Sequence, residues 1–381
     1  MNDPSANDLT PFHAMEILAR ARALEGAGRS ICHLELGEPS APPAPGVLEA
    51  VRRALPEGQP YTPAKGILPL REGLAEFYRR QHGVAVDPER ILVTMGSSAA
   101  FVLAFLGGFP RPARIAVTRP GYPAYLNTLA GLGLPSVEIP LDSGSGWRLT
   151  AEMVEAAYRQ QPFDGLLFAS PANPTGAAVT REGLGEIVAT CRRLGVRLIS
   201  DEIYHGLTYG EPSASALEFG ADAVVINSFS KYHCMTGWRV GWMVLPQDLV
   251  RRVEMLQQNL FISAPTLGQV AGLAALGERD YAEEQKAKYA RNRDILTRGL
   301  STLGFAVEPA DGAFYAYADA SAFTNDSMAF CKDLLEIAGV AATPGVDFDR
   351  RNGSRFVRFS YAGSQATIEA ALERMDGFLR R

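Results

Sequence analysis

One lysine in this sequence follows a buried strand and is surrounded by groups that bind phosphate. The apolar run at residues 223–226 is typical of a buried strand, and Ser228, Ser230 and Lys231 come directly after it. Arg239 follows further along the same stretch. Serine hydroxyls and a guanidinium can hold a phosphate dianion, and a desolvated lysine near another cation loses its proton easily and attacks aldehydes. These residues therefore suggest a Schiff base between Lys231 and pyridoxal phosphate.

The stretch from Ser228 to Gly241 resembles the signature of a known enzyme family. It reads S-x-S-K-x-x-x-M-T-G-W-R-x-G, which is similar to the class I and II aminotransferases, the fold-type I enzymes that use pyridoxal phosphate. A serine and a lysine at a strand end would alone more often form a solvated loop, but the whole stretch reverses those odds. The resemblance implies that Lys231 forms the Schiff base and that Ser228, Ser230 and Arg239 bind the cofactor phosphate.

Two earlier segments are expected to contact the cofactor. Gly96, Ser97 and Ser98 open a predicted helix, and the free N–H groups at a helix N-terminus favour an anion, so this turn predicts a second phosphate contact. Ordinary N-capping by either serine is the competing interpretation. Tyr122 matches the family position whose ring stacks on the pyridine, although a lone aromatic residue is more often part of the core.

Three polar residues are expected around the cofactor ring. The motif S-P-x-N-P-T-G places Asn173 where the family binds the phenolic oxygen, and the bond from Asn173 to Pro174 is a candidate for the cis form. A carboxylate opposite the pyridine nitrogen keeps it protonated, and Asp201 is expected to do this. The resemblance assigns Tyr204 to the phenolic oxygen, whereas Glu202 is expected to face a structural partner.

The resemblance also identifies residues for the substrate and for a second subunit. Gly37, in an L-x-x-G-E-P motif, would approach the substrate carboxylate together with Asn173, although a glycine needed for a turn is an equally good interpretation. Arg358 precedes the run F-S-Y-A and would bind that carboxylate, while Arg355 is expected in a surface ion pair. Tyr61 would reach the cofactor phosphate of a neighbouring subunit, which predicts a homodimer with shared sites.

The implied reaction is a transfer of an amino group in two half-reactions. Lys231 as a free amine would move the substrate α-proton, Asp201 and the ring would stabilise the resulting charge, and Arg358 with Gly37 would orient the carboxylate. An L-amino acid would thereby become a 2-oxo acid, and a second 2-oxo acid would run the sequence backwards. The kinetics should be ping-pong.

The residues of the predicted site also bear on the identity of the amino donor. Residues 95–98 carry serine where some bacterial aspartate enzymes of this group carry lysine, so we expect a neutral, apolar or aromatic donor. Lys65 or a residue of the neighbouring subunit can still supply a cation for an acidic donor.

Two alternatives to an aminotransferase remain at this point. Carbon–sulfur β-lyases and the cyclopropane-forming synthase share the fold and the lysine, and these motifs do not distinguish them. A regulator that binds pyridoxal phosphate without turnover is a more remote alternative, because it would need a fused DNA-binding domain and too few residues precede residue 12.

Composition and charge agree with a globular enzyme. The chain has 381 residues, 47% of them apolar, and a net charge of −5 with both signs interspersed, so nothing favours nucleic acid or an anionic membrane as partner. No signal sequence or spanning segment is evident, and we expect a cytoplasmic protein. The four cysteines are widely spaced and fit neither a disulfide framework nor a metal site.

The pattern of strands and helices predicts an α/β fold. Short apolar runs alternate with helical patterns from residue 90 to 246, which predicts a mostly parallel seven-stranded sheet with ligands at the carboxyl ends of its strands. The expected architecture is that of a fold-type I transferase. Residues 45–285 would form the large cofactor-binding domain, and residues 1–44 with 286–381 would form a smaller α+β domain from both chain ends. Short strands are expected at residues 31–36, 314–318 and 340–343, and a helix at residues 327–337.

Overall fold

Seven strands form the central sheet of the molecule, as the sequence predicts. The computed structural model describes residues 9–380, and its largest sheet has the strand order β2-β8-β7-β6-β5-β3-β4. All strands share one direction except β8, which is antiparallel to both neighbours because no crossover helix separates it from β7. The strands are β2 Ile91–Thr94, β3 Ile115–Arg119, β4 Ser136–Pro140, β5 Gly165–Ala169, β6 Arg197–Asp201, β7 Val224–Ser228 and β8 Gly241–Val244.

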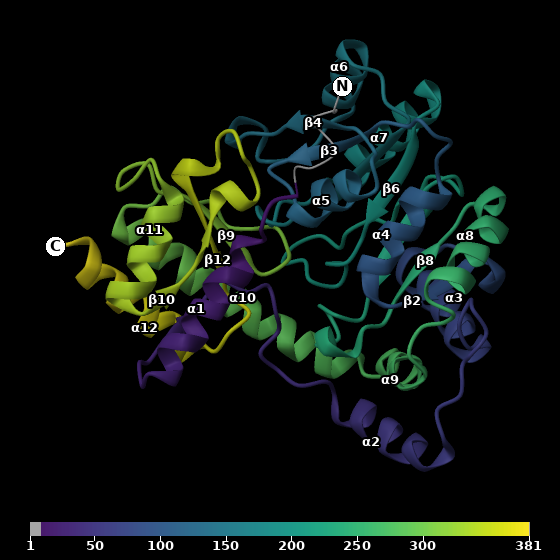
Figure 1. The fold of residues 1–381 in the computed structure, drawn as a ribbon, viewed down its shortest axis with the longest axis horizontal. Helices are drawn as coiled ribbons and strands as arrows, with labels where there is room; N and C mark the ends of the chain where they lie inside the picture. The colour runs from purple at the N-terminus through teal and green to yellow at the C-terminus, as the bar shows by residue number, and fades with distance from the viewer. Residues whose placement is uncertain (1–8, 381) are drawn as a thin grey trace.

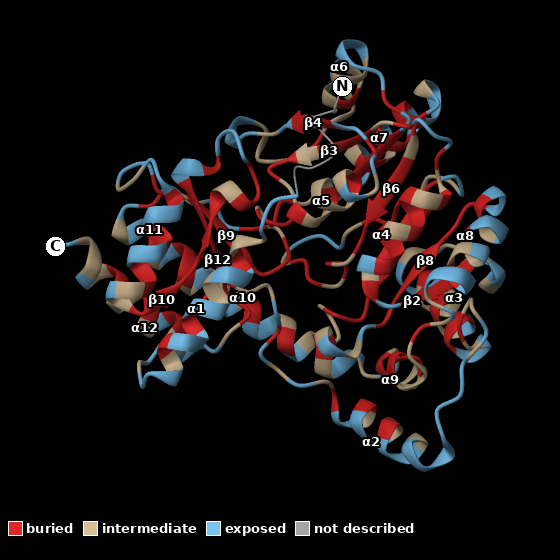
Figure 2. Ribbon diagram, in the orientation of Figure 1, coloured by how far each residue is buried: buried red, intermediate tan, exposed pale blue. Residues whose placement is uncertain are grey.

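Helices cover both faces of this sheet and bury nearly all of its strands (Figure 2). Alternate residues of every strand except the edge strand β4 enter two separate cores; in β7, for example, Val225 faces one core while Val224 and Ile226 face the other. One face is covered by α4 Gly96–Gly107, α5 Pro123–Gly131 and α8 Gln247–Leu260. The other is covered by α2 Pro45–Ala54, α3 Leu68–His82, α6 Ala151–Gln160, α7 Arg181–Leu194 and α9 Thr266–Ala275.

A second, smaller unit contains strands from both ends of the chain. Its antiparallel sheet has the order β11-β12-β9, and a separate parallel pair joins β1 to β10. Figure 1 shows its C-terminal strands in yellow with α1, in purple, against them. The elements are α1 His13–Gly26, β1 Cys32–His33, α10 Arg279–Leu303, β9 Tyr315–Asp319, α11 Ser327–Asp333, β10 Val340–Ala341, β11 Thr343–Pro344, β12 Phe356–Ser360 and α12 Gln365–Leu379.

Three expected elements differ from the observed ones. The strand expected at residues 31–36 is only two residues long, because the Glu35 carbonyl accepts hydrogen bonds from the side chains of Thr343 and Arg358 instead of a neighbouring strand. The strand expected at 340–343 is split between β10 and β11, which belong to different sheets. The helix expected at 327–337 consists of α11, which ends at Asp333, followed by a short π-helix at Leu334–Ala338.

The predicted boundary between the domains falls inside a helix. α10 runs without interruption from Arg279 to Leu303 and so passes through residue 285. The division at 44 and 285 stays a prediction. In the part of the chain that the structure describes, none of the helices combines the length and the apolar character needed to cross a bilayer.

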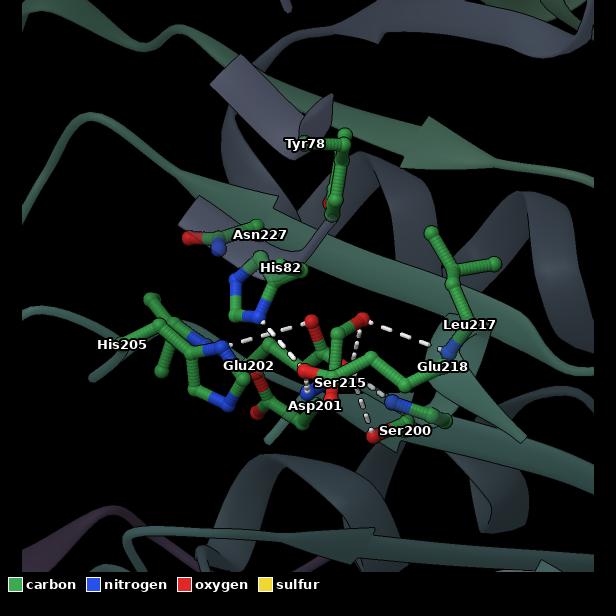
Figure 3. A network of polar contacts seen from close by, with 12 residues as sticks. Tyr78, His82, Ser200, Asp201, Glu202, His205, Ser215, Leu217, Glu218 and Asn227 are labelled. Carbon is green, nitrogen blue, oxygen red and sulfur yellow. Dashed lines mark hydrogen bonds and ion pairs between the residues drawn. The ribbon is translucent and has the colours of Figure 1, made fainter. Parts of the chain in front are cut away.

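A buried polar network fixes the carboxyl end of β6 (Figure 3). Glu202 Oε1 accepts hydrogen bonds from Ser200 Oγ at 3.1 Å, Ser215 Oγ at 3.0 Å and the Ala216 amide at 2.9 Å. Burial raises the pKa of Glu202 to about 8. Glu202 thus has the structural partners that the sequence interpretation gave it, and it ties the strand end next to Asp201 to residues 215–216.

We expect Glu202→Gln to reduce the loss of stability between pH 5 and pH 8. A carboxyl whose pKa is raised by folding stabilises the folded state fully at pH values below its pKa in the unfolded chain. This contribution is lost as pH rises through the folded-state pKa of about 8. The amide cannot ionise, so the variant should avoid a loss on the order of 2–5 kcal/mol. Urea denaturation at pH 5, 6.5 and 8 measures the difference.

The control is Glu57→Gln, which makes the same change of charge at an exposed position. Identical pH profiles of unfolding free energy for the two variants would contradict the role given to the buried carboxyl.

Candidate active site

Most of the predicted site residues line one cavity of about 350 Å³. It lies where the carboxyl ends of β5, β6 and β7 face the smaller unit, and it also receives the first turn of α4. The predicted residues that line it are Gly37, Ser97, Ser98, Tyr122, Asn173, Asp201, Tyr204, Ser230, Lys231, Arg239 and Arg358. Tyr61, Gly96 and Ser228 do not line it.

Lys231 presents a partly desolvated amine to this cavity. Its Nζ donates a hydrogen bond to the Gly37 carbonyl at 2.6 Å. The pKa of Lys231 is lowered to about 8, mainly by burial and also by Arg358 and Arg239, while Glu38 and Asp201 act in the opposite direction. A fraction of the amine is therefore unprotonated near neutral pH and can act as a nucleophile.

A cradle for an anion lies beside the lysine at the start of α4. Gly96 has φ +69°, and a Cβ at this position would lie 2.6 Å from Arg239 Nη2, so the guanidinium packs directly over the glycine. Gly241 allows a similar approach, since its Cβ would lie 3.0 Å from the Ser97 amide. No side chain caps α4, so the competing N-cap interpretation is wrong and the amides of its first turn are left for a ligand.

Ser228 lies behind this cradle. Its Oγ donates to the Val240 carbonyl at 3.1 Å and accepts a hydrogen bond from the Ser230 amide at 3.1 Å. The hydroxyl is thus used to close the loop between β7 and β8, and it supports Ser230, which does line the cavity. Ser228 itself does not line the cavity, and its predicted contact with the phosphate stays a prediction.

Asp201 lies on the floor of the cavity with two protein donors. Its carboxylate accepts hydrogen bonds from the Ile203 amide at 3.1 Å and from the Tyr125 hydroxyl. The pKa of Asp201 is raised to about 6 because burial outweighs the opposing effect of the hydrogen bond from Tyr125. Tyr125 was missed by the sequence interpretation, although it follows Tyr122 by one helical turn and so faces the same side.

Arg358 is buried and held from several sides. Nη1 donates to Asn173 Oδ1 at 2.9 Å, and the guanidinium lies between the rings of Tyr315 at 4.4 Å and Phe348 at 4.7 Å. Its Nε is buried without a hydrogen-bond partner, which fits a carboxylate ligand. Arg355, by contrast, is 53% exposed and pairs with Asp319, as expected.

Gly37 is required by a close contact and not by a turn. It lies outside the left-handed φ region, so the turn interpretation is wrong. A Cβ on Gly37 would overlap the Tyr315 hydroxyl, which also lies 2.7 Å from the Tyr204 hydroxyl. The sequence interpretation placed Tyr315 only in a strand and missed its position in the cavity.

Tyr61 is 80% exposed, and its predicted contact across a dimer stays a prediction. Two further polar residues of the cavity, Glu38 and Thr236, had no predicted role. Thr236 donates a hydrogen bond to Glu38, and both line the cavity near Lys231.

Comparisons with known proteins agree on one family. The family model described as "Aminotransferase class I and II" matches residues 30–375. The chain is 44% identical over 97% of its length to the "Valine--pyruvate aminotransferase" of Mycobacterium tuberculosis, 96% of which is covered. Among solved structures, an aminotransferase from Mycobacterium tuberculosis is similar with a TM-score of 0.95 and 43% identity, covering 100% of this chain and 99% of that one. The aspartate aminotransferase of Thermus thermophilus with maleate has a TM-score of 0.92 and 32% identity, covering 99% of each chain.

We expect Gly96→Ala to abolish binding of inorganic phosphate to the cavity. An alanine there takes a left-handed conformation, which costs about 1–2 kcal/mol, and its methyl group also displaces the Arg239 guanidinium. Isothermal titration calorimetry with phosphate measures the binding, and urea denaturation measures the stability.

Gly83→Ala is the matched control. Gly83 has φ +67° with no atom within 4 Å of the added Cβ, so this variant should lose similar stability and keep phosphate binding. Unchanged phosphate binding in Gly96→Ala would contradict the anion cradle.

Proposed function

The chain belongs to the class I and II aminotransferases, enzymes that transfer amino groups to 2-oxo acids, and we propose that its donor is an L-amino acid with a neutral, apolar or aromatic side chain. The observation that carries this proposal is the composition of the cavity wall. Three residues of the α1 segment, Phe12, Met15 and Leu18, line the cavity. Further apolar side chains come from Leu36, Phe101 and Ile203.

The cations of the cavity argue against an acidic donor. Over residues 9–380, the cations that line it are Lys231, Arg239 and Arg358, and each has a proposed role other than binding a substrate side chain. Lys65 pairs with Glu89 and does not line the cavity. The Mycobacterium tuberculosis relative is named for valine, a branched apolar donor.

The donor set of the cavity fits pyridoxal phosphate, which enzymes of this family use. We propose that Arg239, Ser230 and the first turn of α4 with Ser97 and Ser98 hold its phosphate. The Tyr122 ring would stack on the pyridine, Asp201 would pair with its nitrogen, and Asn173 with Tyr204 would bind the phenolic oxygen. When bound, the cofactor supplies an electron sink for the pair released at the substrate α-carbon.

The residues of the chain then perform binding and proton transfer. Arg358 binds the substrate α-carboxylate through its unpartnered Nε, beside Gly37 and Asn173. Lys231, with a pKa of about 8, holds or releases a proton at Nζ and carries it away from the α-carbon. Asp201 must be ionised to pair with a protonated ring nitrogen, and its hydrogen bond from Tyr125 favours that state. Two half-reactions in ping-pong order follow from this arrangement.

We expect valine, leucine or phenylalanine to react at least about tenfold faster than aspartate in a single half-reaction, because an acidic side chain finds apolar partners in the cavity. The measurement adds one amino acid at a time, without a 2-oxo acid, to cofactor-loaded protein. Visible absorption and the amount of 2-oxo acid formed are followed together. Aspartate as the fastest donor would contradict the proposed substrate class.

Two controls accompany this experiment. Lys231→Ala should abolish turnover, whereas Lys332→Ala, at an exposed position of α11, should leave it unchanged. Full activity in Lys231→Ala would overturn the assignment of the amine. Many equivalents of ammonia and 2-oxo acid from a single amino acid would instead indicate a β-lyase.

We also propose a homodimer in which Tyr61 reaches the cofactor phosphate of the neighbouring subunit. Tyr61 is strongly exposed, and so are the nearby apolar side chains of Leu55 and Leu68. Its loop is held by the bond from Thr266 Oγ1 to the Pro60 carbonyl at 2.7 Å. A large aromatic side chain held in place at the surface is suited to an interface.

Analytical ultracentrifugation should give a mass twice the 41.1 kDa of one chain. Tyr61→Phe should keep that mass and weaken cofactor affinity about three- to tenfold, because one hydrogen bond to a phosphate is lost. Tyr158→Phe, whose residue does not line the cavity, should bind the cofactor like the unmodified protein. A monomer with full cofactor affinity would contradict the proposed role of Tyr61.

A further inference from the structure

Tyr315 is a buried tyrosine at the centre of the active-site cavity. Its Oη lies 2.7 Å from the Oη of Tyr204, and its ring lies against the guanidinium of Arg358 at 4.4 Å. On the remaining side its hydroxyl abuts the backbone of Gly37, where a Cβ would overlap it. Tyr315 thus contacts Tyr204, which is proposed to bind the phenolic oxygen of the cofactor, and Arg358, which is proposed to bind the substrate carboxylate. It also lies against the backbone of Gly37.

The backbone just before Tyr315 is hydrogen-bonded to two loops that follow strands of the large sheet. The Ala313 amide donates to the Leu207 carbonyl at 2.8 Å, and the Gly312 amide donates to the Gly176 carbonyl at 2.9 Å. Gly176 belongs to the same motif as Asn173, and Leu207 follows shortly after Tyr204. The position of the Tyr315 ring is therefore coupled to the two segments that carry its functional neighbours.

The hydroxyls of Tyr204 and Tyr315 share one hydrogen bond, which uses the proton of one of them. The proton of the other hydroxyl can then be donated to a different acceptor. Within residues 9–380 the Tyr315 hydroxyl has one hydrogen-bond partner, Tyr204, and on its other side it occupies the space that a Cβ on Gly37 would fill, so its proton is available for Tyr204. If Tyr315 donates, the proton of Tyr204 is free for an acceptor in the cavity. The opposite direction would use the Tyr204 proton within the pair.

We propose that Tyr315 is a positioning residue that donates its hydrogen bond to Tyr204 and so directs the Tyr204 hydroxyl, as a donor, into the cavity. This rests on the proposed function, in which Tyr204 binds the phenolic oxygen of pyridoxal phosphate. A chain of hydrogen bonds polarises its members, so Tyr204 becomes a stronger donor and stabilises negative charge on that oxygen.

The charged groups around the pair stay in place when only the Tyr315 hydroxyl is removed. Arg358 and Asp201 face the pair, and Lys231 and Tyr122 line the same cavity. Tyr315→Phe keeps the ring that lies against Arg358. A change in this variant therefore reports the hydroxyl and not a collapse of the cavity.

The test is the pH midpoint of the visible absorption of the bound cofactor in four proteins: unmodified, Tyr204→Phe, Tyr315→Phe and the double variant. We expect both single variants to shift the midpoint upward, Tyr315→Phe by roughly 0.5–1 pH unit, or about three- to tenfold in proton affinity. Because Tyr315 acts through Tyr204, the double variant should match Tyr204→Phe.

Tyr317→Phe is the matched control, since it removes a buried hydroxyl without a partner from the same face of β9. It should titrate like the unmodified protein. An unshifted midpoint in Tyr315→Phe, or an equal further shift in the Tyr204→Phe background, would overturn the inference. An unmodified protein without cofactor absorption would instead overturn the proposed function.

Discussion

The site depends on the burial of a lysine amine in a cavity that also contains two guanidiniums. Desolvation is the largest cause of the low pKa of Lys231, and Arg358 and Arg239 add to it. Glu38 and Asp201 oppose these effects, and the Gly37 carbonyl accepts a hydrogen bond from the amine. The amine is consequently near the balance between its charged and neutral forms, which suits the attack and the proton transfer proposed for Lys231.

The order of strands brings these groups together. β5, β6 and β7 are neighbours in the central sheet and parallel, so their carboxyl ends lie at one edge. Asn173, Asp201 and Lys231 all lie at or just beyond these ends. Glu202, the residue after β6, accepts hydrogen bonds from residues 215–216 and so fixes the end of the strand. Asp201 therefore lies between this polar network and the cavity.

The smaller unit supplies side chains that complete the wall of the cavity. β12 supplies Arg358 and β9 supplies Tyr315, and both reach residues of the larger sheet's loops. The contacts of Arg358 with Asn173 and of Tyr315 with Tyr204 join the proposed carboxylate site to the proposed cofactor site. The contacts between the two units and the proposed recognition of the substrate therefore use the same side chains.

The sequence by itself determined the family, the seven strands and half of the residues that line the cavity, because these are expressed in local patterns: buried runs, turn residues and short motifs. The tertiary structure decided the rest. That Ser228 lies behind Ser230, that Gly37 makes room for Tyr315, and that Tyr125 reaches Asp201 all depend on contacts between distant segments. No local pattern specifies which side chain of another strand or helix fills a given space, because that is set by packing across the whole fold.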